Sequence, residues 1–98
     1  MNEKLTVIAH ARAKAGREAE ARELLLGLVA PTRSEAGCID YDLHQSADDP
    51  VRFVFYENWT TAAALEAHSR SAHITQFRKI CGEVLAEGPI VSKWKLLL

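Results

Sequence analysis

Apolar and polar residues alternate along four stretches of the chain, and a period of two is typical of β-strands that have one face in a hydrophobic core. The predicted strands are residues 4–12, 38–45, 51–59 and 90–98. The third strand differs from the others, because Phe53 and Phe55 occupy one of its faces while Val54 and Tyr56 occupy the other. A strand that is apolar on both faces is expected to be buried on both, so this sheet should be covered on each side.

Between the first and second strands, apolar residues recur at helical spacing instead. The residues at positions i, i+3, i+4 and i+7 are Ala21, Leu24, Leu25 and Leu28. This spacing predicts an amphipathic helix with one face toward the core. Pro31 has no amide hydrogen to bond to the carbonyl of Gly27, so we expect a kink at this point. The helix should end before Gly37, since glycine suits the position that follows a helix C-terminus.

A second helical region follows the third strand and is predicted to be split in two. Thr60 or Thr61 can cap a short helix that runs to residue 67 or 68, and Ser71 can cap the next helix. Apolar residues of the second helix recur at i, i+3, i+7 and i+10. They are Ile74, Phe77, Cys81 and Val84. Because glycine and proline interrupt helices, Gly88 and Pro89 are expected to end this helix directly before the fourth strand.

The resulting order of elements, β-α-β-β-α-α-β, predicts an α+β fold of the ferredoxin-like split βαβ type with an antiparallel sheet. In that fold the helices lie on one face of the sheet. The other face would be left open, although the third strand is apolar on both sides. A homodimer packed through this sheet face, with an isologous twofold contact, is the expected cover.

The composition limits the kinds of partner. The chain has 98 residues, of which 48% are hydrophobic and 26% charged, and its formal net charge is -1. Such a balanced charge gives no support for nucleic acid as a partner. No apolar run is long enough to span a membrane, and the alternating N-terminal residues do not form a signal-peptide core. The two cysteines form no CxxC pair and can both be free thiols. The lack of a membrane span, the lack of a signal-peptide core and the free thiols together predict a cytoplasmic protein.

Two histidines, His68 and His73, are the main candidates for chemistry. A neutral imidazole at His68, between helices and sheet, could accept a proton from a substrate. The alternative for each histidine is a structural role. Their five-residue separation spans a predicted helix break, whereas zinc ligands on a helix lie at i and i+4, so no metal site is predicted. The sequence contains no glycine-rich phosphate loop, nucleophile elbow or HExxH motif.

Aromatic residues on the predicted strands could form the wall of a site for a flat apolar ligand, or they could simply fill the core. The candidates are Tyr41, Phe55 and Trp59. Glu57 shares the face of Phe55 and Trp59, which leaves two interpretations. Either Glu57 is an inward carboxylate paired with an arginine such as Arg12 or Arg33, or the faces assigned to the third strand are wrong.

Four segments, in their order along the chain, resemble the antibiotic biosynthesis monooxygenase family, and in particular its small bacterial quinol monooxygenase-like members. They are LTVIAHARAKAG, SEAGCIDYDLH, FVFYENW and LEAHSRSAHITQF. The resemblance implies that residues 1–98 form a single antibiotic biosynthesis monooxygenase-like domain in a dimeric α+β barrel. It implies a monooxygenase that oxidises a quinol or polycyclic phenol with molecular oxygen, without flavin, haem or metal, so no cofactor is expected. It also implies that His68 and His73 are catalytic and that four aromatic residues bind the substrate. These are Tyr41, Phe55, Trp59 and Phe77.

Other branches of the family supply the alternatives. The haem-degrading branch uses an Asn, a Trp and a His, and the corresponding positions here are Ala9 or His10, then His68, then a residue near Arg78. All three positions differ from that branch, so the resemblance does not imply haem degradation. A proton-transfer isomerase, or a protein that binds a small carbonyl compound in the same pocket, stays open, and only a monooxygenase would consume oxygen. A purely structural dimer would have its pocket filled by its own side chains and both histidines bonded to the backbone.

Overall fold

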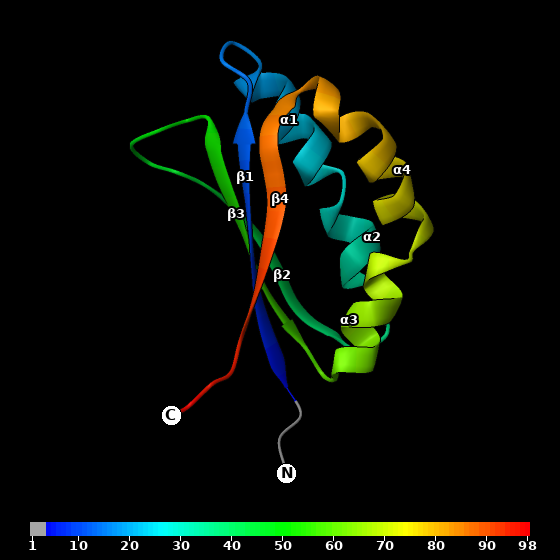
Figure 1. The fold of residues 1–98 in the computed structure, drawn as a ribbon. Helices are drawn as coiled ribbons and strands as arrows, with labels where there is room; N and C mark the ends of the chain where they lie inside the picture. Colours follow the sequence, from blue (N-terminus) through cyan, green and yellow to red (C-terminus); the bar gives the residue numbers. More distant parts are fainter. Residues whose placement is uncertain (1–3) are drawn as a thin grey trace.

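The computed structural model describes residues 4–98, and its strands form one antiparallel sheet in the order β2-β3-β1-β4 (Figure 1). The strands are β1 (Leu5–Ala13), β2 (Cys38–Gln45), β3 (Arg52–Trp59) and β4 (Leu85–Trp94). Every pair of neighbouring strands is antiparallel. This order and pairing confirm the predicted ferredoxin-like α+β fold.

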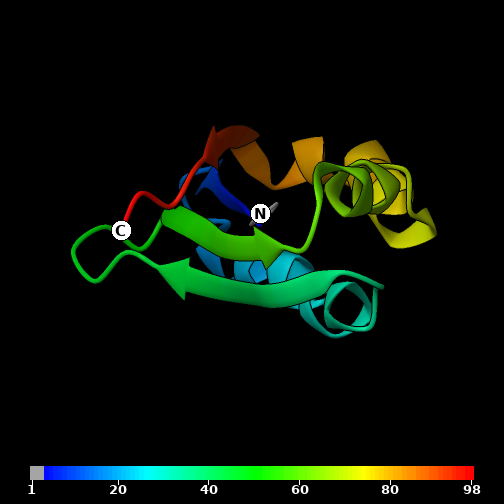
Figure 2. The ribbon, with the colours of Figure 1, turned by 90° about the horizontal axis from the view of Figure 1, so that it is seen from below.

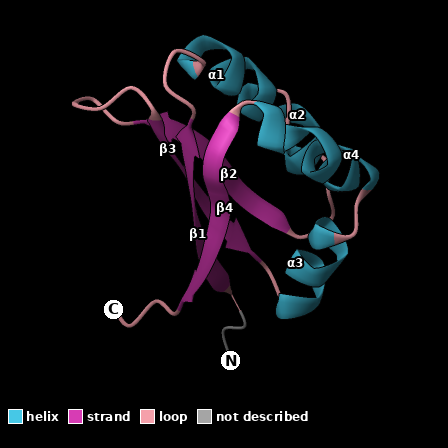
Figure 3. Cartoon of the chain, turned by 45° about the horizontal axis from the view of Figure 1, so that its top comes forward, coloured by secondary structure: helices cyan, strands magenta, loops and turns pink. Residues whose placement is uncertain are grey.

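The helices cover one face of this sheet. They are α1 (Glu18–Leu26), α2 (Val29–Arg33), α3 (Ala62–Ser69), α4 (Ala72–Ile80) and the short 3-10 turn η1 (Cys81–Glu83). Figures 1 and 3 show the α-helices together on the same side of the strands. The first helical region is interrupted at Gly27 and Leu28, as expected from the missing amide hydrogen of Pro31. The Thr61 hydroxyl accepts a hydrogen bond from the amide of Ala64 (3.1 Å) and caps α3, as predicted.

The start of β4 corrects one expectation from the sequence. Gly88 and Pro89 do not end the last helix, because α4 ends well before them and both lie inside β4. The amide of Lys14 donates to the carbonyl of Val84 (2.9 Å), which attaches the chain to the edge of the sheet directly after η1. Gly88 has a φ of 89°, and a Cβ at this position would lie 2.3 Å from the carbonyl oxygen of His10. The irregular pairing of β1 with β4 at this point therefore requires glycine.

The core lies between the inner face of the sheet and the helices. The central strand β1 contributes small side chains to it, since Ala9 and Ala11 stand opposite Phe55 and Phe53 of β3. The helical region contributes Ala21, Leu25, Leu28, Ile74 and Phe77. Protein interiors are normally filled to high density. Because two alanines on the central strand fill little of the space above it, the surrounding larger residues can enclose a cavity there.

The opposite face of the sheet has no cover within residues 4–98. Cross-strand pairing places Tyr56, Ile90 and Trp94 on this face, together with Ile8. The first three side chains are 43, 52 and 54% exposed. Large apolar residues gathered on one face often mark an interaction surface. None of the helices formed by residues 4–98 has the length and apolar character needed to cross a bilayer.

Candidate functional site

A cavity of about 250 Å³ lies between the inner face of the sheet and the helices α3 and α4. Its apolar lining residues are Val7, Ala9, Leu28, Tyr41, Phe55, Ala62, Leu65, Ile74, Phe77, Pro89 and Val91. The polar lining residues are Glu57, Glu66, His68, Ser69, Arg78 and Lys93. An apolar pocket with a few polar groups is the usual composition of a small-molecule site. A purely structural dimer, by contrast, would have this space filled by its own side chains.

His68 lies in the last turn of α3 and is 8% exposed. Its ring contacts two aromatic rings, with centroid distances of 4.7 Å to Trp59 and 5.7 Å to Tyr41. Its Nδ1 is 2.6 Å from Oε2 of Glu35. Because an ionised carboxylate only accepts hydrogen bonds, Nδ1 carries the proton, and the lone pair of the neutral ring is on Nε2. Among residues 4–98 none forms a hydrogen bond with Nε2, and His68 lines the cavity.

The surroundings of His68 favour its neutral, basic form. Burial lowers the pKa of His68 below its ordinary value of 6.5, and this effect outweighs the hydrogen bond and the charge of Glu35, which raise the pKa. At neutral pH the imidazole can therefore accept a proton. A carboxylate that orients a histidine through Nδ1 also stabilises the imidazolium that forms after proton transfer.

Glu35 is the main residue of the site that sequence reasoning missed. It lies in the loop between α2 and β2, and two features hold this loop against α3. The amide of Thr60 donates to the carbonyl of Gly37 (2.8 Å), and Gly37 has a φ of 85°. A Cβ on Gly37 would lie only 2.5 Å from the Cβ of Ala64. Figure 2 shows α2 and α3 at the same end of the β2–β3 strand pair, which explains how Glu35 reaches a histidine in α3.

His73, the second residue of α4, does not line the cavity. Its Nε2 is 3.0 Å from Oε2 of Glu35 and 3.0 Å from the hydroxyl of Thr32. Glu35 therefore bridges the two histidines, whose ring centroids are 6.0 Å apart. In this position His73 helps to hold the Glu35 carboxylate and lies one contact away from the cavity.

The same three residues form a set of possible metal ligands. Glu35, His68 and His73 each offer one ligand atom, and these atoms lie within 4.8 Å of one another. One carboxylate with two imidazoles suits Zn²⁺ and similar divalent ions. The five-residue separation of the two histidines did not predict this grouping, because the break between α3 and α4 turns both side chains toward one carboxylate. In the structure Nδ1 of His68 bonds to Oε2 of Glu35, and Nε2 of His73 lies 3.0 Å from the same oxygen and bonds to the hydroxyl of Thr32, so these atoms already have partners within the protein.

Glu57 is the second titratable group in the wall of the cavity. It is 4% exposed, and its Oε1 accepts a hydrogen bond from Nε1 of Trp59 (2.9 Å). Burial raises the pKa of Glu57 from 4.5 to about 7, so this carboxyl exchanges its proton near neutral pH. The inward orientation of Glu57 is confirmed. The predicted arginine partner is wrong, because Arg33 binds Asp42 instead (2.9 Å).

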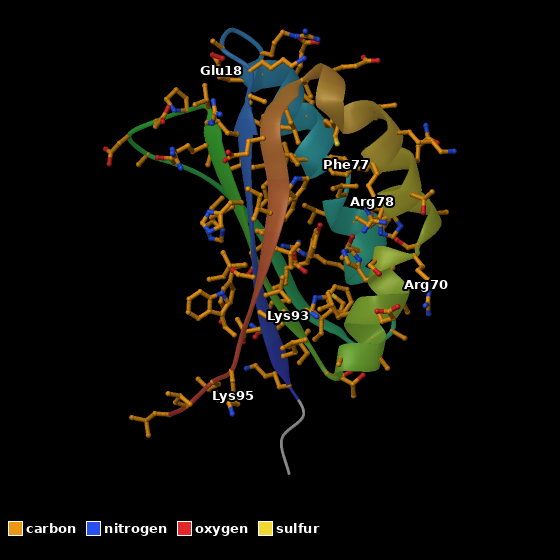
Figure 4. All side chains as sticks on the ribbon, viewed as in Figure 1. Glu18, Arg70, Phe77, Arg78, Lys93 and Lys95 are labelled. Atoms are coloured by element: carbon orange, nitrogen blue, oxygen red, sulfur yellow. The ribbon has the colours of Figure 1, made fainter. Side chains whose placement is uncertain are left out.

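The six predicted site residues divide into two groups. His68, Tyr41, Phe55 and Phe77 line the cavity, whereas Trp59 and His73 lie behind the lining. Tyr41 stacks on Phe55 with a centroid distance of 4.7 Å, which gives the sheet side of the cavity an aromatic surface. Phe77 belongs to the helix side (Figure 4). Trp59 supports the site indirectly, since it packs on the ring of His68 and bonds to Glu57.

The family of the chain follows from comparison with known proteins. Residues 4–80 match the family model described as antibiotic biosynthesis monooxygenase. The chain belongs to this family. A relative from Mycobacterium tuberculosis, named "Putative monooxygenase Rv0793", is 35% identical over 85 residues, which cover 87% of this chain and 83% of that protein. The resemblance found in the four sequence segments is thereby confirmed, and it supports a monooxygenase-like function.

Several solved structures share the whole fold. The crystal structure of PA3566 from Pseudomonas aeruginosa matches with a TM-score of 0.93 and 36% identity, and the match covers 100% of this chain and 98% of that one. The structure of Rv0793 from Mycobacterium tuberculosis matches with a TM-score of 0.88 and 33% identity, over 96% and 95% of the two chains. A crystal structure named antibiotic biosynthesis monooxygenase matches with a TM-score of 0.87 and 31% identity, over 96% and 99%.

Proposed function

We propose that this family member oxidises a small phenol or quinol with molecular oxygen and needs no cofactor. One observation carries the proposal: His68, in the wall of an apolar cavity, bonds to Glu35 through Nδ1 and leaves Nε2 free to accept a proton. Removal of a phenolic proton is the step that makes such a compound reactive toward oxygen. Membership of the antibiotic biosynthesis monooxygenase family supports oxygen as the second substrate.

The first step in this proposal is a proton transfer. The hydroxyl proton of the substrate passes to Nε2 of His68, and the Glu35 carboxylate stabilises the imidazolium that results. A phenolate is left among apolar and aromatic side chains with little water around it. Because water no longer solvates its charge, the phenolate gives up an electron more readily than it would in solution.

The second step is the reaction with oxygen. The phenolate gives one electron to dioxygen, and the phenoxyl radical and superoxide then combine to form a C–O bond at a ring carbon. His68 returns its proton to the outer peroxide oxygen, and Glu57, with a pKa of about 7, accepts the hydrogen of that ring carbon as a proton. Cleavage of the O–O bond leaves a carbonyl on the ring, and the departing hydroxide takes the proton from Glu57 and leaves as water. One oxygen atom enters the product and one becomes water, so the phenol and dioxygen are converted to a quinone and water.

The size of the cavity limits the substrate. Its volume of about 250 Å³ is just below the lower end of the range for drug-sized ligands, about 300 Å³. A compound of one or two rings fits this volume better than a larger polycyclic phenol. The stacked rings of Tyr41 and Phe55 supply a surface against which such a flat molecule can lie.

Oxygen consumption by metal-free protein tests the proposal. Naphthols and reduced naphthoquinones should cause uptake above the autoxidation blank. His68→Ala should lower the enzymatic rate by roughly 10²- to 10⁴-fold, the usual contribution of a general base. His44→Ala is the matched control, since His44 is exposed on the other face of the sheet and should not change the rate. Absence of uptake with every substrate, or full activity of His68→Ala, would contradict the proposal.

A proton-transfer isomerase is the second candidate function. The observation in its favour is that two proton-exchanging groups, His68 and Glu57, line the same cavity. One group could remove a proton from a carbon beside a carbonyl, and the other could return a proton at a different position. Deuterium that enters a recovered carbonyl substrate from heavy water, without oxygen uptake, would favour this reaction.

We infer that a second copy of the chain covers the open sheet face. Tyr56, Ile90 and Trp94 support this inference, because they expose about half of their surface on one side of the sheet. A small domain also buries a limited fraction of its own surface and gains stability from a partner. An isologous contact through this face would produce the dimeric α+β barrel that the family resemblance implies.

A further inference from the structure

Two positively charged side chains, Arg78 of α4 and Lys93 of β4, line the cavity beside its apolar walls. Both residues are exposed, so they lie where the cavity opens to solvent. Figure 4 shows Arg78 on the helix side of the molecule and Lys93 on the sheet side. Within residues 4–98, neither residue forms an ion pair. Two cations from different elements therefore face one opening without a protein counter-ion.

Neighbouring groups determine the positions of both cations. Nη1 of Arg78 donates to the carbonyl of Ser69 (2.6 Å), which keeps the guanidinium near the turn between α3 and α4. The other N–H groups of the guanidinium can still donate. Lys93 pairs across the sheet with Val7, a lining residue, so its side chain leaves the inner face of β4. The aliphatic part of a lysine can lie along an apolar wall while its ammonium group reaches solvent.

The nearby carboxylates do not neutralise these cations. Glu66, the acidic residue among the exposed lining residues, pairs with Arg70 (3.0 Å). Glu57 lies inside and bonds to Trp59, and its pKa of about 7 means that it is partly protonated at neutral pH. The opening of the cavity is thus positively charged, and its interior offers apolar surface and a proton acceptor.

We propose that the substrate is a hydroxylated aromatic carboxylate, with its carboxylate between Arg78 and Lys93 and its hydroxyl at His68. A planar guanidinium matches a carboxylate with two parallel hydrogen bonds, and the lysine adds a second positive charge. Two fused rings that carry both a hydroxyl and a carboxylate suit a cavity that is apolar along its walls and has polar groups from α3, α4 and β4 in its lining. The position of the hydroxyl at His68 rests on the proposed oxygenase function. The position of the carboxylate between Arg78 and Lys93 does not.

Equilibrium binding tests the anion site without turnover. Isothermal titration calorimetry can compare 6-hydroxy-2-naphthoate with 2-naphthol, which has the same rings and hydroxyl but no carboxylate. We expect the naphthoate to bind at least about tenfold more tightly, the factor typical of one charge-assisted hydrogen bond. This preference should shrink as salt is added, because the opening is exposed to solvent. Equal affinity of the two ligands would overturn the proposal.

Substitution of the two cations locates the site. Arg78→Gln and Lys93→Gln should each weaken binding of the naphthoate about 3- to 10-fold and leave binding of 2-naphthol unchanged. Lys79→Gln and Lys95→Gln are matched controls, since each removes a nearby exposed cation that does not line the cavity. The controls should keep the wild-type preference. A double variant, Arg78→Gln with Lys93→Gln, that also kept it would overturn the proposal.

Oxygen uptake by the same variants separates this inference from the proposed function. Binding that depends on both cations, without oxygen uptake, would support the carboxylate site and refute the oxygenase. Uptake with uncharged naphthols and hydroxynaphthoates alike, unchanged in the double variant, would refute the carboxylate site and support the oxygenase.

Discussion

Replacement of Glu35 tests the hydrogen bond on which the proposed chemistry depends, from Nδ1 of His68 to Oε2 of Glu35 (2.6 Å). In Glu35→Gln an amide oxygen can still accept this bond, so His68 keeps its proton on Nδ1 but loses a neighbouring negative charge. That charge raises the pKa of His68, so the pKa of His68 should fall. The base acts only when unprotonated, and the acidic limb of the rate profile should therefore move to lower pH.

Glu35→Leu should have a much larger effect. No acceptor for Nδ1–H remains, so the proton should move to Nε2, which would then present an N–H group to the cavity in place of a lone pair. The rate should fall by about 10²- to 10⁴-fold, the contribution of a general base. Loss of the charged hydrogen bond between Glu35 and His68 should also lower the free energy of unfolding by about 1–3 kcal/mol. Glu35→Gln keeps the acceptor, so its rate should fall much less than that of Glu35→Leu.

Two measurements separate these outcomes. Nitrogen-15 chemical shifts of the His68 ring report the tautomer whether or not the protein turns over, and oxygen uptake across a pH series gives the rate profile. A Glu35→Leu variant in which His68 keeps its proton on Nδ1, or which retains wild-type activity, would refute the proposed role of Glu35. A shift of the acidic limb to higher pH in Glu35→Gln would contradict the effect assigned to the charge.

Three further predictions concern the cavity, the buried carboxyl and the open sheet face. Ala9→Leu should fill the cavity, weaken binding of 2-naphthol more than about tenfold and leave the fold intact. Calorimetry measures the binding, and circular dichroism checks the fold. Unchanged binding would show that the ligand lies elsewhere. Glu57 has a pKa of about 7 in the folded protein against an ordinary value of 4.5, so the folded state holds the carboxyl proton more tightly than the unfolded state does. The folded protein should therefore lose up to about 3 kcal/mol of stability as pH rises from 4.5 to about 7. Urea unfolding at both ends of the interval should show that Glu57→Gln lacks this loss; an identical pH dependence in the two proteins would argue against the raised pKa. Trp94→Glu should convert the expected dimer to a monomer in sedimentation velocity, and a wild-type protein that is already monomeric at micromolar concentration would make the dimer prediction wrong.

Local patterns in the sequence were sufficient to predict the elements and their order. The alternation in residues 38–45 and 51–59 follows from burial of one face of each strand, and that cause acts on every second residue. The break near Gly27 follows from the chemistry of Pro31, four residues away. The inward face of Glu57 could be read from the same alternation, because β3 continues without a bulge from Phe53 to Trp59 in its pairing with β1.

Contacts between distant residues could not be predicted in this way. Glu35 lies in a loop without periodicity, and it bonds to His68 where that loop lies close to α3 at Gly37 and Ala64. The distance between His68 and His73 depends on how α3 and α4 turn, which their separation along the chain does not specify. The bridging carboxylate, and with it the proton-accepting nitrogen of His68, therefore emerges only from the three-dimensional arrangement.

The end of the last helix shows a different limit. Cys81 and Val84 continue the helical spacing of Ile74 and Phe77, yet α4 ends before them. Val84 is buried through contact with the sheet edge, where its carbonyl accepts from Lys14. An apolar residue at a helical position therefore indicates burial, and the neighbouring element decides whether the helix continues.

The place of β4 at one edge of the sheet has a consequence for how ligand binding changes its local stability. β4 has a single neighbouring strand, β1, within residues 4–98, and it supplies Pro89, Val91 and Lys93 to the cavity. Pro89 has no amide hydrogen to give to the ladder, and the pairing is irregular between His10 and Arg12. A strand bonded on one side, with an interrupted ladder, opens at a lower free energy than the central strands. We therefore expect β4 to open locally more often than β3, and a ligand that contacts Pro89, Val91 and Lys93 should slow amide hydrogen exchange in β4 more than in β3.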